Sequence, residues 1–325
     1  MARAPKTLQI DEEERFLARV AWACEIEGVT QAEAASRFGV TRLRVNKALG
    51  EARRRGIVRV YIDSAFAPCA EAERALLDRF GLCDAYVAPG PTRAADVQTV
   101  VGTALGHHLA DLLAGPEITL FGMSWGNTLN LATRFMRPLN RPDLEIVSVM
   151  GGLTRGSDLN SFEITTRLAD LCNARHSYFT APLYASSSES RETLIKQDVF
   201  RDLLDKIRRT DALAMAAGDI SERSLLMRDG LPSDTTRQDL IDAGAVGDVL
   251  GYVLDAEGRL VDHRINSRVI GIELDDLRAI PNVILAAGGA HKVPIIRAVL
   301  RLGVINTIVT DEETARALLN GGDTP

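Results

Sequence analysis

The sequence predicts an α/β protein of two domains, a small helical domain at the N-terminus and a larger domain built on a mostly parallel, Rossmann-like sheet. The chain has 325 residues, about twice the length of a typical single domain. Apolar residues near the N-terminus recur at helical spacing, whereas from about Ala65 short β-branched runs alternate with amphipathic segments. We therefore expect domain boundaries at 1–65 and 66–325.

The composition is that of an ordinary globular protein. Apolar residues make up 46% and charged residues 25%, which excludes a disordered chain. No apolar run approaches the roughly 20 residues that span a bilayer, and the N-terminus lacks the apolar segment of a signal peptide. We expect a cytoplasmic protein without a membrane partner.

Charge is distributed unevenly along the chain. The net charge is −6, but residues 1–65 hold 12 Lys and Arg against 9 Asp and Glu, and the remainder holds 26 against 35. An acidic body argues against nucleic-acid binding along the whole chain, while the basic N-terminal part permits it.

The cysteines give no sign of a metal site or a disulfide framework. The four lie far apart, without a C-x-x-C pair or a histidine at zinc-ligand spacing: Cys24, Cys69, Cys83 and Cys172. We expect reduced thiols, no metal and no cofactor.

The N-terminal domain is predicted to contain three helices. The first begins in the acidic segment at Asp11 and ends before Gly28. Thr30, with Glu33 three residues later, forms a capping box that opens a helix through Phe38. Thr41 caps a third helix that runs to about Arg55. A strand over 57–62 follows, either as one arm of a wing or as the start of the linker.

The second and third helices fit a helix-turn-helix. Ala35 supplies the small residue where two helices approach, Gly39 supplies the turn, and apolar anchors follow at Val40, Val45 and Leu49. The alternative is a solvated basic helix in an ordinary three-helix subdomain.

The third helix and the segment after it carry the basic charge of the domain. Arg42, Arg44, Asn46 and Lys47 stand at the helix start, where such motifs present side chains to the major groove. Arg53, Arg54 and Arg55 lie at the far end, where we expect phosphate contacts. Operator DNA is the predicted partner.

The larger domain alternates strands and helices. We predict strands at 85–87, 118–121, 145–149, 176–180, 212–216, 283–286 and 307–309, and helices at 97–113, 161–172, 292–302 and 312–319. Ligands of such sheets bind beyond the carboxyl ends of the strands, so the loops there are the candidate sites.

The segment 118–129 is the best candidate for binding a phosphate. Gly122, Ser124, Gly126 and Thr128 lie between a strand and an amphipathic helix, where glycines admit an oxyanion, hydroxyls donate and the helix N-terminus adds free N–H groups. It matches neither a Walker A loop nor a dinucleotide-binding fingerprint. A tight strand-to-helix turn without a ligand is the alternative.

Three further glycine-rich segments are candidate ligand loops. They are 149–155, with Gly151 and Gly152; 286–292, with Gly288, Gly289 and Lys292; and 243–248, with Asp248. Lys292 would direct its cation at an anion, unless it is an ordinary surface lysine. Asp248 would accept hydrogen bonds from sugar hydroxyls, or else stabilise a turn.

Taken together, the motifs resemble the SorC family of sugar-binding transcriptional regulators. The matching segments run in the family's order, namely TQAEAASRFGVTR, EARRRGIVRV, FGMSWGNTL, GAVGD, LAAGGAHK and IVTDEETARALL. The resemblance implies a homotetramer or homodimer, an effector domain similar to sugar-phosphate isomerases, and a phosphorylated sugar or polyol as effector.

The resemblance also assigns roles to individual positions. Gly122, Ser124, Gly126 and Thr128 match the family's phosphate loop, Gly288, Gly289 and Lys292 match its C-terminal anion-binding turn, and Asp248 matches a position that touches the sugar. Two departures stand out. The chain has Ala217-Gly-Asp219 where the family often has Gly-Ile-Gly. It has Asn127, which we also expect to contact the effector, where the family often has arginine.

The predicted function is a DNA-binding regulator of a sugar or polyol catabolic operon. A sugar-phosphate isomerase or deaminase is the main alternative, but it needs a carboxylate base and usually a His or Lys at the sugar, and only His291 adjoins a candidate loop. A DNA-binding protein whose larger domain is purely structural is the third possibility.

Overall fold

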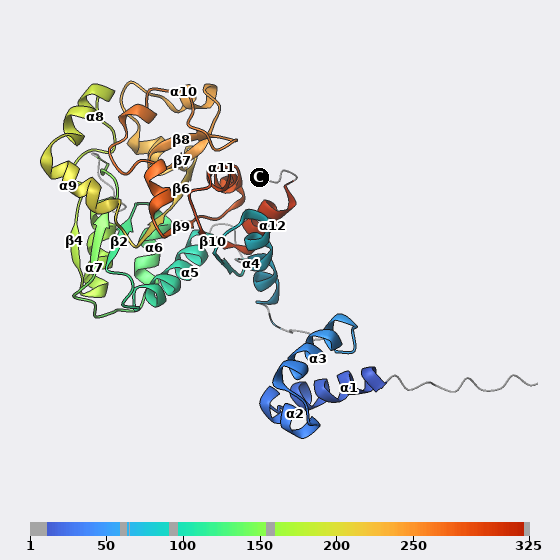
Figure 1. Cartoon of the computed structure of the whole chain (residues 1–325). Coiled ribbons are helices and arrows are strands. Elements are labelled where there is room, and N and C mark those ends of the chain that lie inside the picture. Colours follow the sequence, from blue (N-terminus) through green and yellow to red (C-terminus); the bar gives the residue numbers. More distant parts are fainter. Residues whose placement is uncertain (1–11, 59–63, 65, 91–96, 154–159, 322–325) are drawn as a thin grey trace, which may run out of the picture. The chain divides into compact units, whose positions relative to one another are not determined.

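The computed structural model describes residues 12–58, 64, 66–90, 97–153 and 160–321. Contacts divide the chain into two compact units, Met1–Ser64 and Ala65–Pro325, called here the N-terminal and C-terminal units (Figure 1). No helix in the described ranges is long and apolar enough to cross a membrane.

The N-terminal unit is a small helical domain. Helix α1 (Glu12–Ala21) continues into a π-helical turn, Trp22–Ile26, and is followed by α2 (Gln31–Phe38) and α3 (Arg42–Arg54). The predicted capping box is present, because Thr30 Oγ1 accepts from the Glu33 amide at 3.3 Å and Glu33 Oε2 accepts from the Thr30 amide at 2.9 Å. Gly39 has φ 64°, as the sharp turn requires. The predicted helices are confirmed.

The predicted strand at 57–62 is wrong for the two residues of it that the structure describes, Ile57 and Val58. The amides of Ile57 and Val58 donate to the Ala52 carbonyl at 2.9 and 3.2 Å and so close the end of α3 instead of joining a sheet. The β-branched residues favoured a strand, but the unpaired carbonyls at the helix end compete for the same amides. Residues 59–62, and with them the wing, lie outside the described residues.

The C-terminal unit is organised around a seven-stranded sheet in which every pairing is parallel. The strand order is β1-β10-β9-β5-β2-β3-β4. The strands are β1 (Asp84–Ala88), β2 (Leu120–Met123), β3 (Glu145–Ser148), β4 (Arg175–Ser177), β5 (Ala212–Met215), β9 (Asn282–Ala286) and β10 (Thr307–Asp311). All seven predicted strands are confirmed, and no end is displaced by more than three residues.

Helices cover both faces of this sheet, because its strands carry buried side chains on both sides. Ala212 and Ala214 of β5 pack with α5, α6 and α7, while Leu213 and Met215 belong to the core on the opposite face. The α-helices in the described part of the C-terminal unit are α4 (Ala67–Phe80), α5 (Val97–Leu112), α6 (Asn127–Phe135), α7 (Ser161–Cys172), α8 (Ser188–Ile195), α9 (Asp198–Ile207), α10 (Arg237–Asp242), α11 (Val293–Leu302) and α12 (Glu312–Asn320). Figure 1 shows α5, α6 and α7 together on one side of the sheet.

A second, antiparallel sheet of three strands contains β6 (Ala217–Asp219), β7 (Ala245–Val249) and β8 (Tyr252–Asp255). It corrects the interpretation of 243–248 as a loop, since most of that segment is β7. Glycine is needed at Gly247 because a Cβ there would collide with the carbonyl of Gly218 on the neighbouring strand.

Candidate functional site

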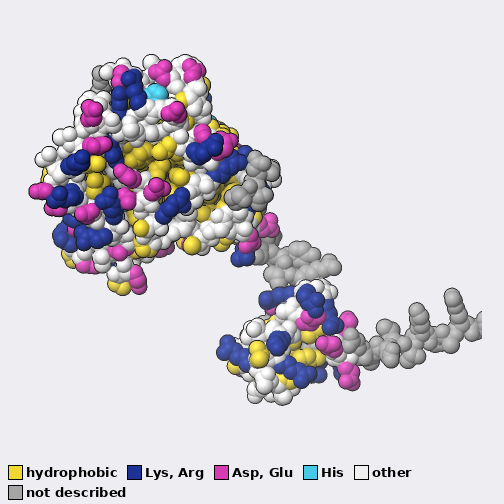
Figure 2. Space-filling model, turned by 45° about the horizontal axis from the view of Figure 1, so that its top comes forward, with side chains coloured by type: hydrophobic (Ala, Val, Ile, Leu, Met, Phe, Trp, Pro, Cys, Tyr) yellow, Lys and Arg dark blue, Asp and Glu magenta, His cyan; other side chains and the backbone are white. Residues whose placement is uncertain are grey.

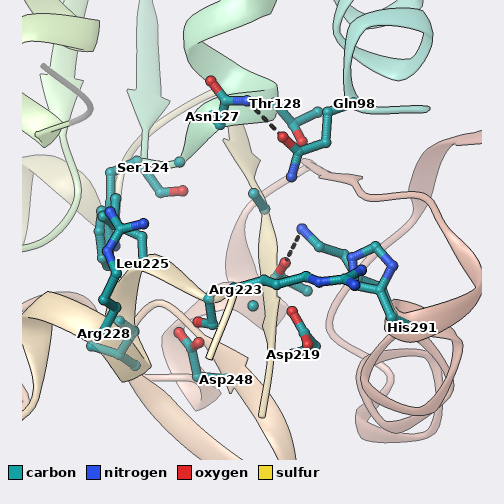
Figure 3. A pocket seen from close by; sticks show the side chains of 18 of the residues that line it. Gln98, Ser124, Asn127, Thr128, Asp219, Arg223, Leu225, Arg228, Asp248 and His291 are labelled. Carbon is teal, nitrogen blue, oxygen red and sulfur yellow. Dashed lines mark hydrogen bonds between the residues drawn. The ribbon is translucent and has the colours of Figure 1, made fainter. Parts of the chain in front are cut away.

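A cavity of about 520 Å³ opens where the chain direction across the sheet reverses. From β2 the chain proceeds outward to β3 and β4, whereas β5 lies on the other side of β2 and leads to β9 and β10. Loops leaving two such strands diverge and leave a crevice at their carboxyl ends. The lining comes from the turn after β2, the start of α5, the small sheet, the segment 223–228 and the turn before α11 (Figure 3).

The turn after β2 presents hydrogen-bond donors to the cavity. Ser124 and Thr128 are 1% and 2% exposed, yet both line the cavity. Gly126 has φ 128°, a conformation that other residues rarely adopt, and no side chain caps the N-terminus of α6. Free amides and hydroxyls at a helix N-terminus form a binding site for an anionic group.

Asn127 is oriented by a neighbour rather than left free. Its Nδ2 donates to Gln98 Oε1 at 2.6 Å, and both side chains line the cavity (Figure 3). The contact ties the first residue of α6 to the start of α5. Asn127 therefore offers its remaining amide groups to a ligand in a fixed orientation.

Two buried carboxylates face the cavity from the small sheet. Asp219 of β6 and Asp248 of β7 are each 5% exposed and lie on adjacent strands (Figure 3). Burial raises the pKa of Asp248 to about 7, and the negative charge of Asp219 adds to this, while the Gly251 amide and Lys292 oppose it. Gly218 makes room for the Asp248 carboxyl, which a Cβ at that position would meet.

Lys292 brings a positive charge into the same region. It is 7% exposed, and its Nζ donates to the Ala217 carbonyl at 2.8 Å. Burial lowers the pKa of Lys292, and the charges of Asp219 and Asp248 oppose that shift. Burial likewise lowers the pKa of the adjoining His291. The lysine is a built-in part of the cavity wall, not a surface residue.

Two arginines add cations at the segment 223–228. Arg228 pairs with Asp229 at 2.7 Å, whereas no carboxylate of the described residues lies within 4.0 Å of the Arg223 side-chain nitrogens. Donors and cations thus accompany two carboxylates in one cavity, which suits a ligand with both an anionic group and hydroxyls. No cluster in the described part of the chain could hold a metal ion.

The cavity gathers six of the predicted effector-site residues: Ser124, Gly126, Asn127, Thr128, Asp248 and Lys292. The sequence did not single out Gln98, Arg223, Ser224 or Arg228 as site residues, and noted Asp219 only as a departure from the family pattern. Arg223 and Arg228 follow neither a glycine-rich turn nor the end of a predicted strand, so no sequence pattern indicated them as site residues.

Five of the predicted glycines do not line this cavity, so their role as ligand contacts stays a prediction. They are Gly122, Gly151, Gly152, Gly288 and Gly289. Gly122 lies within β2, where a Cβ would come 2.8 Å from Val149 Cγ1 of the neighbouring chain segment. Its small size serves packing of the sheet.

The remaining four glycines also have packing partners. A Cβ at Gly151 would meet the Pro182 backbone, and one at Gly152 would come 2.7 Å from Phe162 Cε2. The Gly289 amide donates to Asp311 Oδ2 at 3.0 Å and to Thr314 Oγ1 at 2.7 Å, so it is not free for a ligand. A Cβ at Gly288 would meet the same aspartate. Residues 154 and 155 of the predicted loop 149–155 lie outside the described residues.

In the N-terminal unit, α3 presents the predicted recognition side chains to solvent. Arg42, Arg44, Asn46 and Lys47 are exposed, while Val45, Ala48, Leu49 and Ala52 are buried against α1 and α2. The Arg44 guanidinium lies over the Phe16 ring, 5.2 Å from its centroid. The exposed face of α3 is the candidate nucleic-acid interface.

The arginines at the far end of α3 are ion-paired within the domain. Arg53 pairs with Glu25 at 2.7 Å, and Arg54 and Arg55 both pair with Glu51. These pairs are exposed, and such pairs contribute little to stability. They can therefore be broken at small cost.

Comparisons with known proteins agree on one family. The family described as "Putative sugar-binding domain" matches residues 64–320. The chain is 34% identical over 310 residues to the transcriptional regulator LsrR of Escherichia coli O139:H28 (strain E24377A / ETEC), covering 94% of this chain and 95% of that protein. It is 27% identical over 309 residues to the erythritol catabolism regulatory protein EryD of Brucella abortus (strain 2308), covering 95% and 98%.

A solved structure shares the fold. The full-length sorbitol operon regulator SorC from Klebsiella pneumoniae superposes with a TM-score of 0.71 at 23% identity, covering 95% of this chain and 100% of that one. At that identity the likeness shows the fold alone, a helix-turn-helix domain joined to an α/β domain.

Proposed function

Since the chain belongs to the SorC family of sugar-binding transcriptional regulators, we propose that it controls an operon for the catabolism of a sugar or polyol and responds to a phosphorylated form of that compound. Two relatives are named for erythritol catabolism and for a sorbitol operon, which supports a polyol or sugar as the regulated nutrient. The relatives are regulators, so the alternative of an isomerase or deaminase is set aside.

One observation carries the assignment of the effector. The cavity combines a donor-rich helix N-terminus with a buried lysine and two buried carboxylates. A phosphate matches the turn Ser124–Thr128 and the free amides of α6. Hydroxyls of the carbon chain match Asp248, which at neutral pH is poised between donating and accepting a hydrogen bond.

Lys292 is proposed to attract the effector's negative charge. Its Nζ already has one backbone acceptor, Ala217, which leaves two of its three N–H donors for a ligand. A charged donor placed in a buried site contributes more than one at the surface, because water screens it less.

DNA recognition is assigned to α3. Base edges in the major groove are the proposed contacts of Arg42, Arg44, Asn46 and Lys47, and phosphates are the proposed contacts of Arg53, Arg54 and Arg55 at the far end of the helix.

We also propose that the protein acts as a homodimer or homotetramer, because a symmetric operator is read by a symmetric oligomer. Sizing of residues 66–325 tests whether this unit alone carries the oligomer contacts, and a monomer of that fragment would contradict it.

Calorimetry with matched ligand pairs tests the effector. The pairs are erythritol 4-phosphate with erythritol and sorbitol 6-phosphate with sorbitol, titrated into the full chain. The proposal expects at least one phosphorylated compound, from this set or a wider panel of sugar phosphates, to bind at least tenfold more tightly than its parent. Equal affinity of each parent and its phosphate would contradict the phosphate assignment.

A further inference from the structure

The recognition helix carries an apolar side chain where polar ones prevail. Leu43 is 63% exposed, whereas Val45 and Leu49 of the same helix are 0% and 6% exposed. It is the second residue of α3, between Arg42 and Arg44. Residues at the start of a recognition helix are the ones that reach base edges.

Leu43 shares one stripe of α3 with three other exposed residues. Asn46 and Lys47 follow it by three and four residues and Gly50 by seven, so all four lie on the same side of the helix. Figure 2 shows hydrophobic side chains interspersed with Lys and Arg on the surface of the N-terminal unit.

Gly50 is a second, independent observation on this stripe. It has no positive φ, and a Cβ added there would meet nothing within 4 Å. The fold of the unit therefore does not require a glycine at this position, and glycine inside a helix is less stable than alanine. A glycine on an exposed helical face leaves room for a partner to approach the helix backbone closely.

On the basis of the proposed function of α3 in DNA recognition, we propose that the stripe formed by Leu43, Asn46, Lys47 and Gly50 faces the major groove. Leu43 packs on the methyl group of a thymine, and Gly50 lets the DNA come close to the helix. The thymine methyl is the apolar group that the major groove offers, and it distinguishes thymine from the other bases. Leu43 then specifies a base by packing, alongside the polar contacts of its neighbours.

Uracil substitution tests the contact directly. The full chain selects a duplex from a randomised pool, and each thymine of that duplex is then replaced in turn by deoxyuridine, which removes one methyl group. At the contacted thymine, replacement is expected to weaken wild-type binding about three- to fivefold, the effect of one buried methyl. Leu43→Ala is expected to bind the parent duplex about three- to tenfold more weakly and to be insensitive to the same replacement.

Two controls separate this contact from general damage. Leu260→Ala removes an equivalent exposed leucine, 48% exposed, from the C-terminal unit and is expected to leave DNA affinity unchanged. Random-sequence DNA should bind Leu43→Ala and wild type equally, since only a base contact is lost. If no thymine replacement affects wild type, or if Leu43→Ala stays fully sensitive, the thymine contact is overturned.

Gly50→Ala tests the close approach. Its helical circular dichroism is expected to equal or exceed that of wild type, because alanine favours the helix, while its affinity for the selected duplex falls at least fivefold. Affinity equal to that of wild type would overturn the role given to Gly50.

Discussion

Lys292 contributes a buried positive charge to the cavity without a carboxylate at ion-pair distance in the described structure. Its replacement should therefore affect ligand binding more than the fold, because methionine keeps the apolar stem in place.

We predict that Lys292→Met weakens binding of the phosphorylated effector about 10- to 100-fold, since a charge-assisted hydrogen bond contributes roughly 1.5 to 3 kcal/mol. Calorimetry measures this, and Lys196→Met, an exposed lysine on the surface of the same unit, is the matched control. DNA affinity without effector should remain normal. Unchanged effector affinity in Lys292→Met would remove the lysine from the site.

The raised pKa of Asp248 leads us to predict that the stability of the folded protein depends on pH. Its pKa is raised from 3.8 to about 7 in the folded protein. The carboxyl is protonated in both states below about pH 4, and as the pH rises the unfolded chain loses the proton first. The stabilisation that the protonated Asp248 carboxyl gives the folded protein is therefore fully present below about pH 4 and is lost as the pH rises through about 7.

Asp248→Asn provides the comparison, because asparagine does not titrate. We expect the melting temperature of wild type, relative to that of the variant, to fall steadily between about pH 5 and pH 7 and then to level off. Scanning calorimetry across this range measures the difference. Parallel pH profiles of the two proteins would show that Asp248 titrates normally.

Among the elements, the turn into α6 is the proposed binding site for the effector's anionic group. Gly126 at φ 128° begins the helix, and a Cβ there would contact Ala216 at 3.4 Å. Gly244 offers a matched position, because it has φ 86°, an added Cβ would meet nothing within 4 Å, and the residue does not line the cavity.

We predict that Gly126→Ala and Gly244→Ala each destabilise the protein by about 1 to 3 kcal/mol, the cost of forcing a side chain into such a backbone. Only Gly126→Ala should also weaken effector binding, at least tenfold, because it displaces the α6 amides. Thermal unfolding and calorimetry are compared for both variants. Equal effector affinity in the two would count against the role of this turn.

The two ends of α3 should differ in their effect on DNA. Lys47→Ala is expected to weaken operator binding by about 1 to 3 kcal/mol with little effect on random DNA, as for a base contact. Arg54→Ala should weaken both by similar factors, as for a phosphate contact. Gel shifts with the selected duplex and a scrambled one measure this. The same pattern in both variants would show that the assignment of the two ends is wrong.

The accuracy of the sequence-based prediction differed among elements for physical reasons. Capped amphipathic helices such as α2 and buried β-branched strands such as β10 have strong local patterns, and both were predicted. The small sheet was not, because β6 and β7 are short and glycine-rich and are stabilised by pairing with segments distant in sequence.

The same contrast, between local sequence patterns and contacts made by distant segments, explains which residues of the candidate site were predicted. Ser124 and Thr128 stand in a recognisable strand-to-helix turn, so the sequence indicated them. Arg223 and Gln98 reach the cavity only through the folding of separate segments around it. The five packing glycines shared the composition of a ligand loop, and only the structure shows that neighbouring side chains and backbone occupy the space around them.

For the whole molecule, each unit has its own hydrophobic core, Leu17 to Ala52 in the N-terminal unit and two larger clusters in the C-terminal unit. Under the proposed function, ligand binding in the C-terminal unit must be coupled to DNA binding by the N-terminal unit. The ligand can shift that balance only by its different affinities for the DNA-binding and DNA-free states.

The central claim is that a phosphorylated sugar or polyol in this cavity controls DNA binding, and fluorescence anisotropy of the selected duplex tests it most directly. The phosphorylated compound identified by calorimetry is titrated into the protein–DNA mixture, with its unphosphorylated parent as control. We predict that the phosphorylated compound changes the apparent Kd for the duplex at least fivefold, a coupling of about 1 kcal/mol or more, while the parent changes it little. An unchanged Kd, or the same change with the parent, would contradict the account.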